Sequence, residues 1–142
     1  MNSQKDIEGI QLIAELNNCR RDLLDDVVQI RKLVSSGISA CGFHQMSIDA
    51  QKFHPIGVTV IAIVSESHVA VHTYPEANHV SLDIFHCSAD SARMLKLMAF
   101  FQDGFEAESL KFIEIARGNN LEVRRGDITT PQRTPVSTGT SS

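Results

Sequence analysis

The chain has 142 residues, of which 42% are hydrophobic and 21% charged, a composition typical of one soluble globular domain. Thirteen basic and seventeen acidic residues give a formal net charge of −4, which disfavours a protein that grips nucleic acid by its phosphates. No apolar run approaches the ~18–20 residues that cross a bilayer, and residues 1–6 lack the apolar core of a secretory signal. We therefore expect a cytoplasmic protein that acts on a small molecule and binds neither nucleic acid nor membrane.

The first predicted elements are a strand over 10–16 and a helix that opens at Asp22. Apolar residues spaced by three and four indicate the helix, and Ser35-Ser36-Gly37 is typical of a helix end. A second strand is expected around 38–43. The polar stretch 44–54 that follows is expected to be a loop or a frayed edge.

The centre of the chain has the composition of β-strands. β-Branched residues dominate 58–64, and the strand pattern returns at 69–74 and at 80–85. Residues 75–79, between the last two strands, have the composition of a turn. This pattern predicts a run of neighbouring antiparallel strands.

A second helix is expected over 90–102, capped by Asp90 or Ser88, and a last strand over 110–116. Residues 127–142 are rich in Thr, Ser and Pro, so we expect a single domain over 1–126 followed by a disordered tail. The order β-α-β-β-β-β-α-β predicts an α+β fold. Its form is a two-layer sandwich, with a mostly antiparallel sheet and two helices on one face.

The predicted central hairpin brings chemical groups together. With Tyr74 opposite Val80, the same register places Ser67 opposite Cys87, with Cβ atoms about 4.5–5.5 Å apart. His72 would lie about 17 Å further along the strand and on its opposite face. The sequence therefore predicts that Ser67 and Cys87 are neighbours, and leaves open how His72 could reach them.

Simpler interpretations also fit these residues. Histidines on strands are commonly packed or solvated, and Cys87 beside Phe85 could be a small core residue. Ser67 lacks the G-x-S-x-G elbow of hydrolases. His68 and His72 have the spacing of a zinc pair only on a helix, and no H-E-x-x-H motif is present. On composition and spacing alone, a Ser/His/Cys site and ordinary packing both remain open, and we expect no metal.

The cysteines support no other framework. Cys19, Cys41 and Cys87 are odd in number, far apart and without a C-x-x-C pair. This pattern disfavours structural disulfides and a structural zinc site.

Several motifs resemble those of one family. The pattern S-E-S-H-x-x-x-H-T-[WY]-P-E is matched over 65–76, and the strand D-[IVL]-[FY]-x-C over 83–87. Upstream, 53–59 matches F-x-P-x-G-V-S with Thr59 in place of the serine, and 12–19 resembles the start of the family. On this gapped spacing the chain resembles the prokaryotic S-adenosylmethionine decarboxylase proenzymes, from about Gly9 to Gly118.

The resemblance implies a zymogen that cuts itself between Glu66 and Ser67. The Ser67 hydroxyl would attack the Glu66 carbonyl to form an ester, and β-elimination would break that ester. Ser67 would become a covalent, self-generated pyruvoyl group, the cofactor of the enzyme. The resemblance gives His72 an acid–base role in this step and Thr59 a supporting one.

The resemblance further implies a lyase that removes CO₂ from S-adenosylmethionine through a Schiff base, for spermidine and hence polyamine biosynthesis. Cys87 would return a proton to the substrate carbon. Glu76 would hold the ribose, and Phe53 would stack on the adenine. The family also implies a homodimer of processed two-chain units.

The chain departs from the family pattern on the substrate side. Asn78-His79 replaces Gly-Tyr, His86-Cys87-Ser88 replaces Thr-Cys-Gly, and extra residues lie before Phe53, within 44–54. Some relatives of this kind act on ornithine or arginine, which is one alternative; a non-catalytic partner subunit of the same fold is another. The presence of Glu76 and Phe53 favours S-adenosylmethionine.

Overall fold

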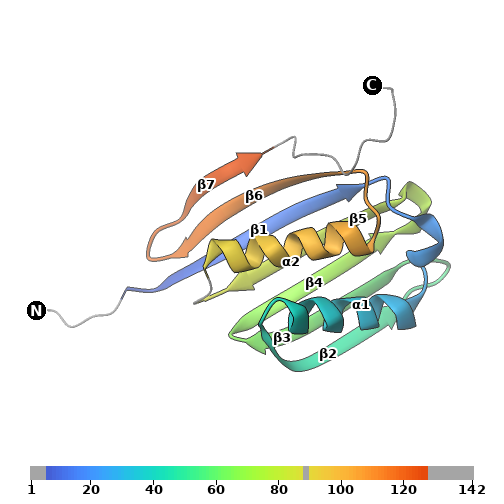
Figure 1. Ribbon diagram of the computed structural model, residues 1–142, viewed down its shortest axis with the longest axis horizontal. Coiled ribbons are helices and arrows are strands. Elements are labelled where there is room, and N and C mark those ends of the chain that lie inside the picture. Colours follow the sequence, from blue (N-terminus) through green and yellow to red (C-terminus); the bar gives the residue numbers. More distant parts are fainter. Residues whose placement is uncertain (1–5, 88–89, 128–142) are drawn as a thin grey trace, which may run out of the picture.

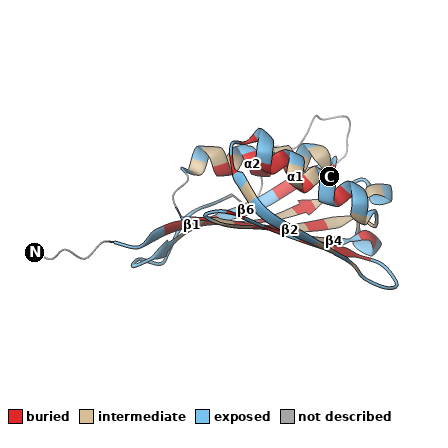
Figure 2. Cartoon of the chain, turned by 90° about the horizontal axis from the view of Figure 1, so that it is seen from below, coloured by how far each residue is buried: buried red, intermediate tan, exposed pale blue. Residues whose placement is uncertain are grey.

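The computed structural model describes residues 6–87 and 90–127, which form one seven-stranded antiparallel sheet with two helices (Figure 1). The sheet order is β2-β3-β4-β5-β1-β6-β7. Both helices lie on the same face of the sheet, and the buried residues lie between the two layers (Figure 2). The predicted α+β sandwich is confirmed. In chain order the elements are β1 (Glu8–Asn17), the 3₁₀ helix η1 (Arg21–Leu23), α1 (Val27–Ala40), β2 (His44–Lys52), β3 (Val58–Ser65), β4 (Ser67–Tyr74), the 3₁₀ helix η2 (Pro75–Ala77), β5 (His79–His86), α2 (Ser91–Gly104), β6 (Ser109–Gly118) and β7 (Glu122–Asp127).

Alternation along the strands builds the core. On β3 every second residue from Val58 to Val64 is buried, and the residues between them are exposed or half-buried. The same period of two on β1 and β5 places their large aliphatic side chains under the helices. None of the described elements covers the opposite side of the sheet, which we call the helix-free face. Isoleucines exposed on this face are Ile13, Ile61, Ile63 and Ile113.

Helix α1 differs from the prediction at both ends. It begins at Val27, where the Asp26 side chain accepts a hydrogen bond from the Gln29 backbone N–H. It continues through Gly37 to Ala40, so the predicted end at Gly37 and the strand over 38–43 are wrong. A glycine stands inside the helix because α1 and α2 pack closely at this point. A Cβ on Gly37 would lie 2.8 Å from Cδ1 of Phe100 on α2. Gly37 therefore marks a close contact rather than a helix end.

The predicted loop over 44–54 is also wrong, because most of it forms edge strand β2. An edge strand has a neighbour on one side only, so its polar side chains can remain solvated and hide the usual strand pattern. Ile48 and Ala50 still pack against the core, and a β-bulge lies between Gln45 and Ser47.

The remaining predicted strands and α2 are confirmed within a few residues, and the Asp90 carboxylate accepts the capping hydrogen bond from Arg93 N–H. Strand β7, the opposite edge, was not predicted. The tail expected over 127–142 lies outside the described residues except for Asp127, which ends β7. Within the described ranges, no helix is both long and apolar enough to cross a membrane.

We expect Gly37→Val to lower the free energy of unfolding by about 1–3 kcal/mol, because the added side chain must displace Phe100. The matched control is Ser39→Val, which places the same side chain at an exposed position of the same helix. Urea unfolding of both variants at one protein concentration measures the difference. Equal losses in the two variants would contradict the packing role of Gly37.

Candidate active site

The β4–β5 hairpin carries the central candidates, and its register differs from the prediction by one residue. Tyr74 pairs with His79 and Ser67 pairs with His86, so the predicted pairing of Tyr74 with Val80 is wrong. The turn explains the shift. Asn78 takes a left-handed conformation with φ 53°, which ends η2 early enough for His79 to begin β5.

Ser67 and Cys87 are nevertheless neighbours, as predicted. The Ser67 Oγ lies 3.9 Å from the Cys87 Sγ. The backbone N–H of Cys87 donates to the carbonyl oxygen of Glu66 at 3.2 Å. Ser67 has φ 146°, a conformation that side-chain-bearing residues rarely adopt and that recurs at functional sites.

His86 adds a contact that the sequence analysis missed. Its Nε2 lies 3.1 Å from the Glu66 backbone nitrogen and 3.0 Å from the Ser65 carbonyl oxygen. Two features of the sequence could have drawn attention to His86. It departs from the family pattern, and it is a histidine at a position of β5 where the alternation faces the core. We call Glu66, Ser67, His86 and Cys87 the cleavage cluster.

His72 is not brought to Ser67 within the chain. It lies five residues further along β4, about 17 Å in an extended strand, and therefore on the opposite face. Its partner is Thr59 on β3, whose Oγ1 lies 3.1 Å from His72 Nδ1. The structure thus unites His72 with the predicted supporting hydroxyl and separates both from the cleavage cluster.

The two predicted substrate-binding residues lie toward the same end of the sheet as His72. Phe53 follows β2, is 47% exposed and donates its N–H to the Gly57 carbonyl at 2.8 Å. Glu76 lies on η2, directly after β4, and is exposed. We call Phe53, Thr59, His72 and Glu76 the His72 group, and it lies at the opposite end of the central strands from the cleavage cluster.

Asp25 fixes the loop that carries Phe53. Its Oδ1 accepts a hydrogen bond from Gly57 N–H at 2.8 Å and lies 3.2 Å from the Lys52 ammonium. The Gly57 N–H, with a smaller contribution from Lys52, holds the pKa of Asp25 below its ordinary value of 3.8. Asp25 was not among the residues predicted for the site.

The three cysteines differ in their surroundings. Cys87 is exposed, whereas Cys19 and Cys41 are buried. Burial raises the pKa of Cys19 to about 12 and also raises the pKa of Cys41. Cys87 is therefore the accessible thiol, and it lies in the cleavage cluster.

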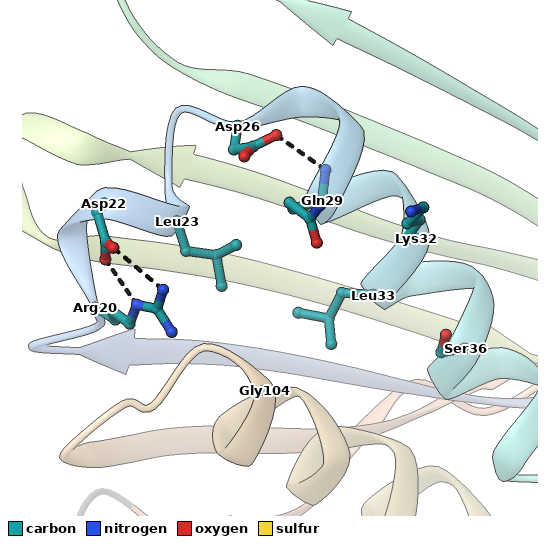
Figure 3. A pocket seen from close by; sticks show the side chains of 9 residues that line it. All are labelled: Arg20, Asp22, Leu23, Asp26, Gln29, Lys32, Leu33, Ser36 and Gly104. Carbon is teal, nitrogen blue, oxygen red and sulfur yellow. Dashed lines mark hydrogen bonds and ion pairs between the residues drawn. The ribbon is translucent and has the colours of Figure 1, made fainter.

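A groove of about 470 Å³ lies on the helix side, between η1, α1 and the end of α2, and no residue of the cleavage cluster or the His72 group lines it (Figure 3). Arg20 at its rim is already paired with Asp22, with 2.7 Å between Nε and Oδ1. No group of three or more His, Cys, Asp or Glu suited to a metal ion occurs among the described residues.

Residues 10–118 match the family model described as S-adenosylmethionine decarboxylase. The chain belongs to this family. The S-adenosylmethionine decarboxylase proenzyme of Methanococcus maripaludis (strain C7 / ATCC BAA-1331) is 34% identical over 110 residues, which cover 78% of this chain and 89% of that protein. The proenzyme of Archaeoglobus fulgidus is 33% identical over 112 residues, with coverage of 79% and 99%.

A solved structure agrees at the level of the fold. The crystal structure of the adenosylmethionine decarboxylase from Aquifex aeolicus VF5 superposes with a TM-score of 0.71 at 22% identity, covering 78% of this chain and 90% of that one. The predicted family resemblance is confirmed, and the matched range agrees with the range predicted from the motifs.

We expect the contribution of Asp25 to stability to depend on pH. A carboxyl whose pKa is lower in the folded state stabilises the fold above its unfolded-state pKa, and this stabilisation is lost as the pH falls through the folded value. The difference in unfolding free energy between the parent chain and Asp25→Asn should therefore shrink below about pH 4. Urea unfolding of both chains from neutral to acid pH measures it, and a difference independent of pH would refute the assignment.

Proposed function

We propose that the chain is the proenzyme of a pyruvoyl-dependent S-adenosylmethionine decarboxylase, whose product serves spermidine synthesis. One observation carries the proposal: the Ser67 hydroxyl and the Cys87 thiol lie together at the bond that the family motif marks for cleavage. The relatives reported above are named for S-adenosylmethionine. The readings as an ornithine or arginine decarboxylase, or as a non-catalytic subunit, gain no support from them.

The contacts of Glu66 suit self-cleavage. As Ser67 Oγ bonds to the Glu66 carbonyl carbon, negative charge develops on the carbonyl oxygen, which the Cys87 N–H already contacts. The C–N bond then breaks, the amine is released and an ester remains. Removal of the Ser67 Cα proton breaks the Cβ–Oγ bond and frees the Glu66 carboxylate as the end of chain 1–66. Water replaces the nitrogen at residue 67 and ammonia leaves, so the second chain begins with a ketone.

The residues around Ser67 also fit the reaction that follows. The pyruvoyl group supplies an electrophilic carbonyl, which draws off the electron pair left when CO₂ departs. Cys87, whose exposed thiol lies beside residue 67, returns a proton to the substrate carbon. Phe53 stacks on the adenine and the Glu76 carboxylate accepts hydrogen bonds from the ribose hydroxyls; both belong to the His72 group, so a second copy must bring them to residue 67.

A homodimer would join the two groups of residues. The helix-free face exposes Ile13, Ile61 and Ile63 at 39%, 45% and 53%, and a second copy packed on it would remove this apolar surface from water. A two-fold axis that lies between the sheets and crosses the strands would bring the Ser67 end of one sheet against the His72 end of the other. In this arrangement His72 of the partner subunit takes the Ser67 Cα proton, which His72 of the same chain is too distant to reach.

The self-cleavage proposal predicts distinct outcomes for two substitutions. Ser67→Ala should remain one chain of full mass, because the attacking hydroxyl is absent. Cys87→Ala should be cut, while kcat falls about 10²–10⁴-fold because the proton donor is lost. Denaturing gels with intact-mass measurement follow cleavage, and CO₂ release from S-adenosylmethionine, ornithine and arginine follows turnover. Cleavage of Ser67→Ala, or full turnover by Cys87→Ala, would overturn these roles.

The dimer proposal predicts cleavage in trans. Chains carrying only His72→Ala should remain uncut, and so should chains carrying only Ser67→Ala. When the two are co-expressed, a mixed dimer unites Ser67 of one copy with His72 of the other, so the His72→Ala chain should be cut. Chains of different tag length separate the products on a gel. If the mixed dimer forms and neither chain is cut, the site is not shared between copies.

A further inference from the structure

His86 occupies a place in β5 where the alternation calls for an apolar side chain. Val80, Leu82 and Ile84 point into the core on the same phase, and His86 follows them with 2% of its surface exposed. Burying a polar ring costs free energy unless it forms hydrogen bonds. The contacts of this imidazole therefore indicate why it is there.

Two contacts of His86 Nε2 go to one peptide unit. The nitrogen lies 3.0 Å from the Ser65 carbonyl oxygen and 3.1 Å from the Glu66 backbone nitrogen. One tautomer of the ring donates to the carbonyl, and the other accepts from the Glu66 N–H. Either tautomer fixes the orientation of the peptide that directly precedes the Glu66–Ser67 bond.

The ring of His86 is itself held in place. It packs against Phe43 with 5.1 Å between the ring centroids, and the Arg93 guanidinium lies 4.5 Å from the Phe43 centroid. Arg93 Nη1 also donates to the Gly42 carbonyl at 2.8 Å. The segment before β2 and the first turns of α2 thus hold the ring that contacts Glu66.

We propose that His86 is a positioning residue for self-cleavage. Two successive residues contact the backbone of Glu66. The Nε2 of His86, the last residue of β5, lies against its nitrogen, and the N–H of Cys87, the next residue, donates to its carbonyl oxygen. This double contact orients the Glu66 carbonyl toward Ser67 Oγ. The contacts of His86 Nε2 are with the Ser65–Glu66 peptide, so it acts through Glu66. The proposal rests on the proposed self-cleavage at this bond.

The test compares two substitutions of nearly equal size. In His86→Gln the side-chain amide can still donate to, or accept from, the Ser65–Glu66 peptide, whereas His86→Met fills similar space and can do neither well. Freshly synthesised precursor is followed by intact mass at one temperature. We expect His86→Met to cut roughly 10- to 100-fold more slowly, the cost of a small misplacement of reacting groups, and His86→Gln to cut close to the parent rate.

A second measurement separates this proposal from self-cleavage itself. In the Ser67→Ala chain, which has no attacking hydroxyl, amide hydrogen exchange at Glu66 reports the contact directly. Adding His86→Met should speed exchange at Glu66 while leaving the core amides of β4 protected, and adding His86→Gln should not. If the parent chain is never cut, the proposed function is wrong, but the exchange measurement still tests the contact between His86 and Glu66. Equal cleavage rates in both His86 variants, or unchanged Glu66 exchange in the Met variant, would overturn the positioning role.

Discussion

The antiparallel pairing of β4 with β5 is the constraint on which the cleavage cluster depends. Ser67 begins β4 and pairs with His86, the last residue of β5, so Cys87 emerges from the sheet directly beside the serine. The same pairing brings the Cys87 backbone N–H to the Glu66 carbonyl. Because backbone hydrogen bonds of the ladder set these positions, the chemistry proposed at Glu66 and Ser67 would inherit the rigidity of the central sheet.

The sheet also separates the site into two parts. Side chains alternate between faces with a period of two, so residues an odd number apart, such as Ser67 and His72, cannot share a face of one straight strand. The helices cover one face, and the isoleucines exposed on the other offer a surface to a second copy. A site completed by two copies would connect catalysis to assembly, since a single copy would hold Ser67 without His72 in reach.

The sequence predicted the elements whose pattern is local. β-Branched runs marked β3 to β5, and Asp90 marked the start of α2, because strand propensity and helix capping act within a few residues. The predictions failed where distant contacts prevail over a local signal. Gly37 was taken for a helix end, yet Phe100 from another helix requires its small size. The polar composition of β2 concealed a strand, because an edge strand with one neighbour tolerates solvated side chains on both faces.

By itself, the sequence determined the family and the fold class and pointed to the residues proposed for the chemistry, because gapped motifs and the β-rich centre are written directly in the order of residues. Only the tertiary structure decided which of those residues meet. The register of the central hairpin depended on one left-handed residue, Asn78, which composition alone does not reveal. The contacts of His86 with the peptide before Ser67 depended on that register. Chain order fixes the chemical groups, but strand pairing and the pleat fix which face and which end of the sheet each one occupies.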